Sequence, residues 1–209
     1  MIDSYRKLTI AKYDEIRKIL NKDIDEIDKQ VELIACLADM DVDKVYDLPL
    51  TKYEQMVRDI EFLYDLPKPK SNIPSKLVIG DFKYKVFKNV EKMTTGQYID
   101  LQNYMKNDMG VAYILTTIII PDGCTYDDGD YNIDDLQKDI YNNLNIEDAL
   151  SIAFFLHRKL QYTIKGIATY LDWTLKKTER KMNPELKTKM KEARKRLKDL
   201  ATSGTGSIW

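Results

Sequence analysis

The sequence has few of the residues that build metal sites and active sites. Its 209 residues include two cysteines, Cys36 and Cys124, and one histidine, His157. Two cysteines with no C-x-x-C spacing exclude a disulfide framework and favour reduced thiols in a cytosolic product. The sequence also lacks a glycine-rich phosphate loop and the G-x-S-x-G and H-E-x-x-H patterns. Because catalysis needs groups that converge on one site, we expect no enzyme, no cofactor and no metal.

Long hydrophobic runs are missing as well. The longest apolar stretch, Met109–Pro121, has about twelve residues, whereas a membrane-spanning helix needs roughly 20. The N-terminus has no cationic region followed by an apolar run, so it does not resemble a signal peptide. We therefore expect no membrane span and an intracellular place of synthesis.

What is present is typical of a folded, mainly α protein. The chain is 44% hydrophobic and 32% charged, enough apolar residues for a core. Apolar residues at helical spacing predict a helix whose buried face carries Ile24, Ile27, Val31, Ile34 and Ala38. Thr51 and Glu54 have the spacing of a capping box, which predicts that the next helix starts with Thr51 as its cap.

A proline-rich stretch divides the sequence. Three prolines lie within Leu66–Pro74, which predicts an extended connector at residues 66–75. It separates an N-terminal helical region, residues 1–65, from a hairpin plus helical core, residues 76–176. Residues 177–209 form the last predicted part, a basic amphipathic helix and tail.

The spacing of apolar residues changes after the connector from a helical period to strict alternation, which predicts a β-hairpin. Leu77–Ile79 forms the first predicted strand, and Phe82, Tyr84 and Val86 alternate with lysines in the second. Between them, Gly80 can take the positive φ of a tight turn. The expected fold class is therefore mainly α with a small β-hairpin: a helical bundle with a projecting, basic C-terminal helix.

The sequence allows either a helix or a strand for the segment 111–120. Its many β-branched residues between Gly110 and Pro121 suggest a buried strand, whereas its neighbours have helical patterns. We favour a helix there.

The acidic loop that follows allows two interpretations. Asp128, Asp130 and Asn132 have the first three ligand spacings of an EF-hand, but Ile133 stands where that loop needs glycine. We therefore favour a loop whose aspartates cap the next helix. A long helix is predicted from Ile146 to about Lys177, with His157 as an ordinary helix residue rather than a general base.

The charges are strongly segregated, although the whole chain is nearly neutral. Residues 157–202 contain 14 Lys or Arg against 5 Asp or Glu, and the rest of the chain contains 19 against 29. A lysine-rich helix in residues 157–202 could simply expose its basic face to water, an interpretation that explains the charge as well as a bound partner does. Joined to an apolar stripe, however, the basic face favours a bound partner. An acidic body with a basic arm favours head-to-tail association, and lysine–phosphate contacts with a DNA backbone are a further possibility.

The last predicted helix, residues 185–200, carries the candidate partner-binding residues. Its apolar positions follow a short heptad seam, and the tail ends in an aromatic residue that can act as an anchor. The candidate residues are Leu186, Met190, Ala193, Arg194, Arg196, Leu197, Leu200 and Trp209.

Three stretches resemble a known group of proteins. They are Gly80–Leu101, the Ile-Ile-Ile-Pro-Asp-Gly-Cys sequence ending at Cys124, and Asp148–Phe155. Across residues 76–156 the chain is similar to small virion and tail-module proteins of tailed phages of gut bacteria, including the crAss-like phages. The shared pattern consists of apolar and turn residues and brings no functional residues with it. The resemblance implies a virion or tail-assembly role.

Three functions follow as hypotheses. The first is a non-enzymatic phage virion protein, made in the host cytoplasm and packed in multiple copies near the portal and tail as a ring or internal cargo protein. Its partners would be copies of itself or neighbouring virion proteins. The second is a tail assembly chaperone that is not retained in the mature particle. The third is a nucleic-acid-binding module that uses the basic C-terminal helix.

Overall fold

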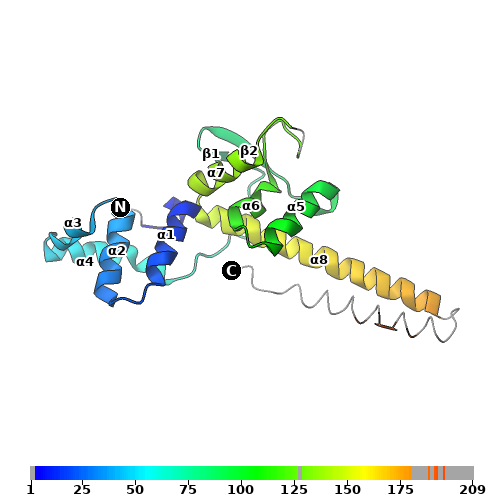
Figure 1. Ribbon diagram of the computed structural model, residues 1–209, viewed down its shortest axis with the longest axis horizontal. Coiled ribbons are helices and arrows are strands. Elements are labelled where there is room, and N and C mark those ends of the chain that lie inside the picture. The colour runs from blue at the N-terminus through cyan, green and yellow to red at the C-terminus, as the bar shows by residue number, and fades with distance from the viewer. Residues whose placement is uncertain (1–2, 127–128, 180–187, 189–190, 193–194, 196–209) are drawn as a thin grey trace. The chain divides into compact units, whose positions relative to one another are not determined.

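The computed structural model describes residues 3–126 and 129–179, together with Thr188, Lys191, Glu192 and Lys195 (Figure 1). The described residues are mainly helical and include a small antiparallel sheet, which confirms the predicted fold class. They belong to two compact units. One contains residues 1–88 and 94–154, and the other contains residues 89–93 and the chain from residue 155 onward.

Short helices make up the first 65 residues of the first unit. Helix α2 contacts α1, α3 and α4, and its residues Val31, Leu33 and Ile34 are buried. Ile27, which was predicted on the buried face, is 66% exposed, because the helix is covered mainly along its second half. The elements are η1 (Tyr5–Lys7), α1 (Ile10–Leu20), α2 (Glu26–Ala38), α3 (Val42–Tyr46), α4 (Leu50–Ile60) and η2 (Glu61–Tyr64).

The predicted capping box at Thr51 and Glu54 is wrong. Helix α4 begins at Leu50, with Pro49 at its N-cap position and no side-chain cap. Pro49 has a φ of −55° and an extended ψ of 139°, the non-helical backbone of an N-cap residue, so the helix starts at Leu50, one residue before Thr51. Thr51 therefore lies within the first turn, and its side chain is exposed.

The sheet contains the predicted hairpin and a third strand, which begins at the end of the segment 111–120, where a helix was favoured over a strand. Strands β1 (Lys76–Ile79), β2 (Phe82–Val86) and β3 (Ile119–Pro121) are antiparallel in the order β1-β2-β3. Ile79 pairs with Phe82, so the turn consists of Gly80 and Asp81 alone. Gly80 has a φ of +57°, the left-handed conformation expected for this glycine.

The segment 111–120 is helix in its first part and strand in its last. Helix α6 (Val111–Thr116) is followed by β3, in which Ile119 pairs with Val86. The favoured helix is thus right for the first six residues and wrong for the end. The hydroxyls of Thr116 and Thr117 donate to the carbonyls of Tyr113 and Ile114, both at 2.7 Å, a local competition that helps to end a helix.

Two side chains fix the start of α5 (Thr95–Lys106). Thr94 and Gln97 form a capping box, in which each accepts a hydrogen bond from the other's backbone N–H. The Gln97 amide also donates to the carbonyl of Thr117 at 3.1 Å, and the side chain is only 2% exposed. Gln97 thereby connects α5 to the end of α6.

The N-terminus of the first unit pairs with the chain just before α8 (Ile146–Glu179). The backbone N–H of Ile10 donates to Leu144 at 3.1 Å, and that of Ile146 donates to Leu8 at 2.7 Å. Between them Thr9 and Asn145 form an isolated antiparallel bridge. Leu8 and Ile10 are buried, so this short pairing ties the two ends of the unit together.

The proline-rich connector has no helix or strand between residues 66 and 75, as predicted. It is nevertheless held in place. The backbone N–H of Lys70 donates to the Ser151 hydroxyl at 2.7 Å, and the Lys88 ammonium donates to the carbonyl of Ile73 at 2.6 Å. Its division of the chain into residues 1–65 and 76–176 stays a prediction.

In the second unit, the described part of α8 carries exposed and half-buried aromatic rings next to basic groups. The Arg158 guanidinium lies 5.6 Å from the ring centre of Tyr162, and the Lys159 ammonium lies 5.9 Å from that of Phe155. His157 is half-buried on the same helix. Within the part of the chain that the structure describes, no helix is long and apolar enough to cross a lipid bilayer.

Candidate functional site

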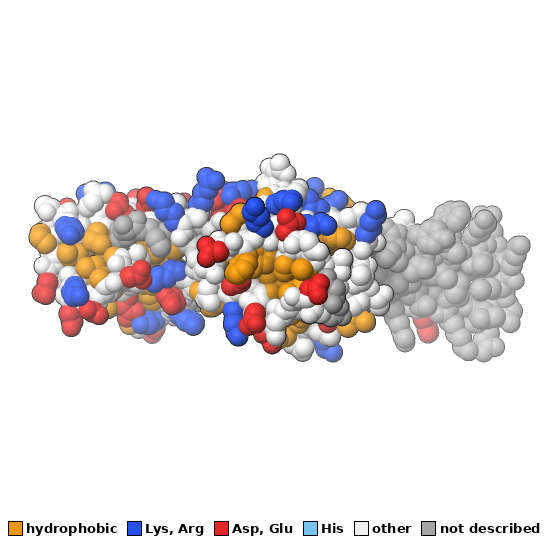
Figure 2. All heavy atoms as spheres, turned by 90° about the horizontal axis from the view of Figure 1, so that it is seen from above, with side chains coloured by type: hydrophobic (Ala, Val, Ile, Leu, Met, Phe, Trp, Pro, Cys, Tyr) orange, Lys and Arg blue, Asp and Glu red, His pale blue; other side chains and the backbone are white. Residues whose placement is uncertain are grey.

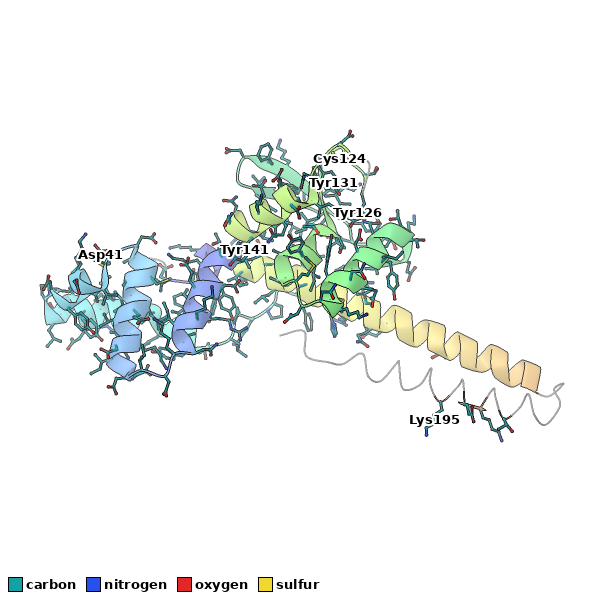
Figure 3. The ribbon with its side chains drawn as sticks, viewed as in Figure 1. Asp41, Cys124, Tyr126, Tyr131, Tyr141 and Lys195 are labelled. Carbon is teal, nitrogen blue, oxygen red and sulfur yellow. The ribbon has the colours of Figure 1, made fainter. Side chains whose placement is uncertain are left out.

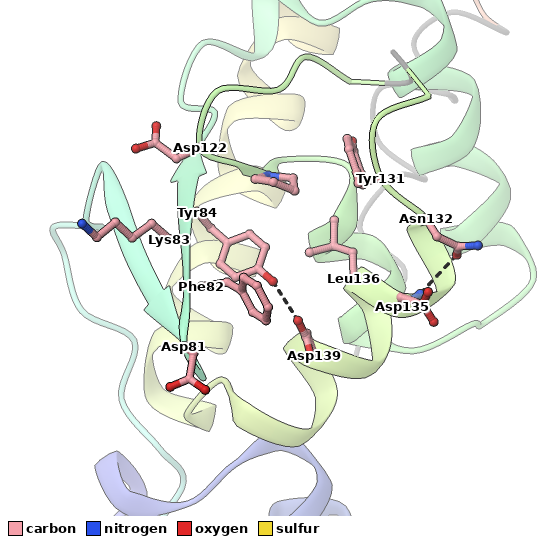
Figure 4. A pocket seen from close by; sticks show the side chains of 11 residues that line it. Asp81, Phe82, Lys83, Tyr84, Asp122, Tyr131, Asn132, Asp135, Leu136 and Asp139 are labelled. Carbon is pink, nitrogen blue, oxygen red and sulfur yellow. Dashed lines mark hydrogen bonds between the residues drawn. The ribbon is translucent and has the colours of Figure 1, made fainter.

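A hollow of about 600 Å³ lies beside the sheet in the first unit, between β2 and β3 on one side and α7 (Ile133–Asn143) on the other (Figure 4). Its lining combines carboxylates with aromatic and other apolar side chains. The lining residues are Asp81, Phe82, Lys83, Tyr84, Pro121, Asp122, Tyr131, Asn132, Asp135, Leu136 and Asp139.

The hairpin supplies one wall. Because the turn has only two residues, Asp81 lies at its tip and Phe82 is the first residue of β2. Tyr84 follows at the next position on the same face and pairs with Pro121 of β3. In Figure 4 the rings of Phe82 and Tyr84 lie beside each other and point toward α7.

Helix α7 supplies the opposite wall. Asn132 caps it, since its side-chain oxygen accepts from the backbone N–H groups of Asp134 at 2.7 Å and Asp135 at 3.2 Å. The expected cap is therefore present, but it is an asparagine rather than one of the loop aspartates. Asp135 and Asp139 are four residues apart, which places both carboxylates on one helix face.

One hydrogen bond joins the two walls. The Tyr84 hydroxyl donates to the Asp139 carboxylate at 2.8 Å (Figure 4). Burial, followed by this hydrogen bond and the negative charge of Asp139, raises the pKa of Tyr84 above its ordinary value of 10.0. Tyr84 therefore stays protonated at neutral pH and acts as a structural donor rather than a proton acceptor.

The rim of the hollow is acidic and partly apolar. Four aspartates line it against one lysine, Lys83. The carboxylate of Asp122 is paired with Lys76 at 3.0 Å, and that of Asp135 with Lys138 at 3.4 Å. Asp81 and Asp135 are both exposed. Phe82 is 63% exposed, a large apolar ring in water next to negative charge. Such a surface suits a ligand that is both cationic and partly apolar.

Tyrosine–carboxylate pairs recur elsewhere in this unit. The Tyr126 hydroxyl donates to Asp100 at 2.6 Å, on the loop where Figure 3 labels Cys124, Tyr126 and Tyr131. Tyr46 donates to Asp28 at 2.8 Å and Tyr64 to Glu26 at 2.7 Å. Burial and the neighbouring carboxylate raise the pKa of Tyr64 to about 12. These hydroxyls hold elements together.

The structure does not describe the candidate partner-binding residues. Leu186, Met190, Ala193, Arg194, Arg196, Leu197, Leu200 and Trp209 all lie outside the described residues. Four of their neighbours, Thr188, Lys191, Glu192 and Lys195, are helical and exposed, and Figure 3 labels Lys195. The role of this segment stays a prediction.

The calcium alternative is also untested in part, because Asp127 and Asp128 lie outside the described residues. Across residues 3–126 and 129–179 and the four further positions, no group of three or more His, Cys, Asp or Glu side chains could hold a metal ion. Cys36 donates weakly to Glu15 at 3.7 Å, and burial raises the pKa of its thiol. Neither cysteine forms a disulfide.

Acidic, basic and apolar side chains are interspersed over the described surface that Figure 2 shows. The hollow was not predicted, because it combines residues 81–84 with residues 131–139. The two signals that could have found it are the exposed aromatic after the turn and the aspartates at helical spacing. No known protein family, curated protein or solved structure matches the chain.

Proposed function

We propose that the protein is a non-enzymatic virion component of a tailed phage, packed in multiple copies in the portal and tail region as a ring or internal cargo protein. The observation that carries the proposal is the division of charge. Residues 157–202 hold 14 basic against 5 acidic residues, and the remainder holds 19 against 29. Such a chain attracts further copies of itself or neighbours of either charge.

Two features of the described residues support an interaction role. The hollow offers carboxylates and an exposed phenyl ring on one surface, which is the composition of a contact surface for a basic partner. The surface is also preformed, because the Tyr84 hydroxyl donates to Asp139 across the hollow. The resemblance of residues 76–156 to small phage virion proteins supports the same role.

A mass-spectrometric inventory of purified phage particles tests the proposal. The protein is expected in mature particles at several copies per portal. Its presence in the infected-cell lysate together with its absence from mature particles would instead identify a tail assembly chaperone, and the proposal would be abandoned. Absolute quantification with isotope-labelled peptides separates stoichiometric incorporation from carry-over.

The basic segment favours one other function, the binding of nucleic acid. If residues 183–209 contact DNA phosphates, affinity falls steeply with salt and is lost when these residues are removed. Fluorescence anisotropy with duplex DNA at several salt concentrations measures both. Salt-independent or undetectable binding excludes this alternative.

A further inference from the structure

We propose that the hollow between β2–β3 and α7 binds the basic segment, residues 176–198, of a second copy of this chain. The inference rests on the proposed function, because it names the surface through which copies associate. It commits to one occupant, and four properties of the hollow and the segment support it.

Charge is the first property. The basic segment contains 11 Lys or Arg and 3 Asp or Glu. Of the four aspartates that line the hollow, Asp122 is paired with Lys76 at 3.0 Å. Asp81 and Asp135 are exposed at the rim, Asp135 with the Lys138 ammonium 3.4 Å away on the same helix, and Asp139 lies deeper, bonded to Tyr84. Complementary charge of this kind draws the two surfaces together and sets their register.

Apolar surface is the second property. Phe82 is 63% exposed at the edge of the hollow, and Leu136 is buried in its wall. A lysine or arginine can lay its aliphatic stem along such a ring and keep its charged group near the carboxylates. The segment also has apolar residues of its own, Leu186 and Met190, so both kinds of surface have a counterpart.

Preorganisation is the third property. Neither wall needs to move to form the site, because the Tyr84–Asp139 hydrogen bond already joins them. The backbone adds a second constraint, since the N–H of Asp122 donates to the carbonyl of Lys83 at 2.9 Å. A surface held in this way loses little conformational entropy on binding.

Stoichiometry is the fourth property and favours a second copy as the occupant. Each chain carries both this hollow and the basic segment, so every copy can accept a segment and donate one. The contact is heterologous, because different surfaces of the two copies meet. Contacts of this type continue from copy to copy and give a ring where the rotation closes or an open filament where it does not. Either assembly contains several copies of the chain.

Sedimentation equilibrium of the full chain tests the proposal at about 0.1 M and about 1 M salt. The wild type is expected to self-associate, and more weakly at the higher salt. The double variant D81K/D135K reverses the exposed charges of the hollow, and its dissociation constant should rise at least about tenfold. The matched control D43K/E54K makes the same change of net charge on α3 and α4, at exposed residues outside the hollow, and should stay within about twofold of the wild type.

A mixing experiment identifies the partner surface. Lys191 and Lys195 are exposed and four residues apart, so K191E/K195E reverses charge on one side of the basic segment. It should associate as weakly as D81K/D135K when alone, and a mixture of the two variants should associate again. Phe82→Ser leaves the charge unchanged and should weaken association several-fold, which keeps the test valid if D81K/D135K is poorly folded.

Three results would overturn the inference: a monomeric wild type, equal effects of D81K/D135K and D43K/E54K, or no recovery in the mixture. The particle inventory is independent of these results. If the protein is found in particles but D81K/D135K does not change its self-association, the proposed function stands and the hollow has no part in it.

Discussion

The ammonium group of Lys70 lies 2.8 Å from a carboxylate oxygen of Asp148 and 3.4 Å from one of Glu147. This places the proline-rich connector against the first turn of α8. Asn145 completes the arrangement, since its amide donates to Asp148 at 2.7 Å while its oxygen accepts from the Asp148 backbone at 2.9 Å. Burial alone raises the pKa of Asp148, but hydrogen bonds from Lys70 and Asn145 and the charges of Lys70 and Arg6 lower it overall.

Lys70→Met should therefore lower the free energy of unfolding by about 1 kcal/mol, the upper end for a partly exposed ion pair. Because the pKa of Asp148 is lowered in the folded state, its contribution is present above the ordinary pKa of 3.8 and is lost as the pH falls through the folded value. Urea denaturation at neutral and acidic pH measures both effects. Lys138→Met, at the exposed pair with Asp135, is the control and should change stability by less than about 0.5 kcal/mol. Equal losses for the two variants would contradict this prediction.

Gln97→Ala should be more damaging than its position near a helix end suggests. The substitution removes one half of the capping box and leaves the buried carbonyl of Thr117 without its side-chain donor. We expect a loss of about 1–3 kcal/mol. Gln102→Ala, at an exposed position on the same helix, should be close to neutral. Thermal and urea unfolding of both variants measure the free energy of unfolding. An unchanged value for Gln97→Ala would refute the role of this amide.

Two glycine-to-alanine substitutions should have opposite effects. Gly80→Ala places a residue with a side chain at a φ of +57°. The added Cβ would lie 3.7 Å from the Asn143 Nδ2, an ordinary van der Waals distance. The cost is thus conformational, about 1–2 kcal/mol. Gly96→Ala lies in the first turn of α5 with its nearest neighbour at 3.8 Å, so it should stabilise by up to about 1 kcal/mol. The difference in urea midpoints is the measurement, and the same sign for both would be inconsistent with the turn geometry.

Stability should also decline in alkaline solution. The pKa values of Tyr5 and Tyr64 are raised to about 12, mainly by burial. A pKa raised in the folded state means that the contribution is complete below the unfolded value of about 10 and is lost as the pH rises toward 12. Tyrosinate absorbance should show groups that ionise well above pH 10 in the native protein and near 10 in urea. Tyr64→Phe should remove one of the late-ionising groups; an unchanged titration curve would contradict the assignment.

Local signals in the sequence predicted the parts of the fold that local physics decides. The hairpin was found because Gly80 and the alternation at Phe82, Tyr84 and Val86 act within a few residues. Strand β3 was not favoured over a helix, because Ile119 pairs with Val86, which lies far away along the chain. No residue near Ile119 indicates that partner. The cap at Thr51 was misplaced because Pro49 starts the helix first.

The hollow shows the same limit. Its two walls come from residues 81–84 and 131–139, and each wall has an ordinary local explanation: a turn with an aromatic, and an amphipathic helix with aspartates. The Tyr84–Asp139 hydrogen bond, between residues 55 positions apart, joins them. The predicted partner-binding residues from Leu186 to Trp209 were chosen from charge and heptad spacing, and the described residues leave that prediction untested.

The pairing of Leu8 and Ile10 with Leu144 and Ile146 has a consequence for folding during synthesis. The backbone groups that pair with Leu8 and Ile10 are synthesised 138 and 134 residues after them (146 − 8 and 144 − 10), on the order of ten seconds later at ordinary elongation rates. During that interval Leu8 and Ile10, at most 1% exposed in the folded protein, lack these two backbone partners. The strand-like segment at Leu8 and Ile10 can therefore complete its backbone pairing only after Ile146 has been synthesised.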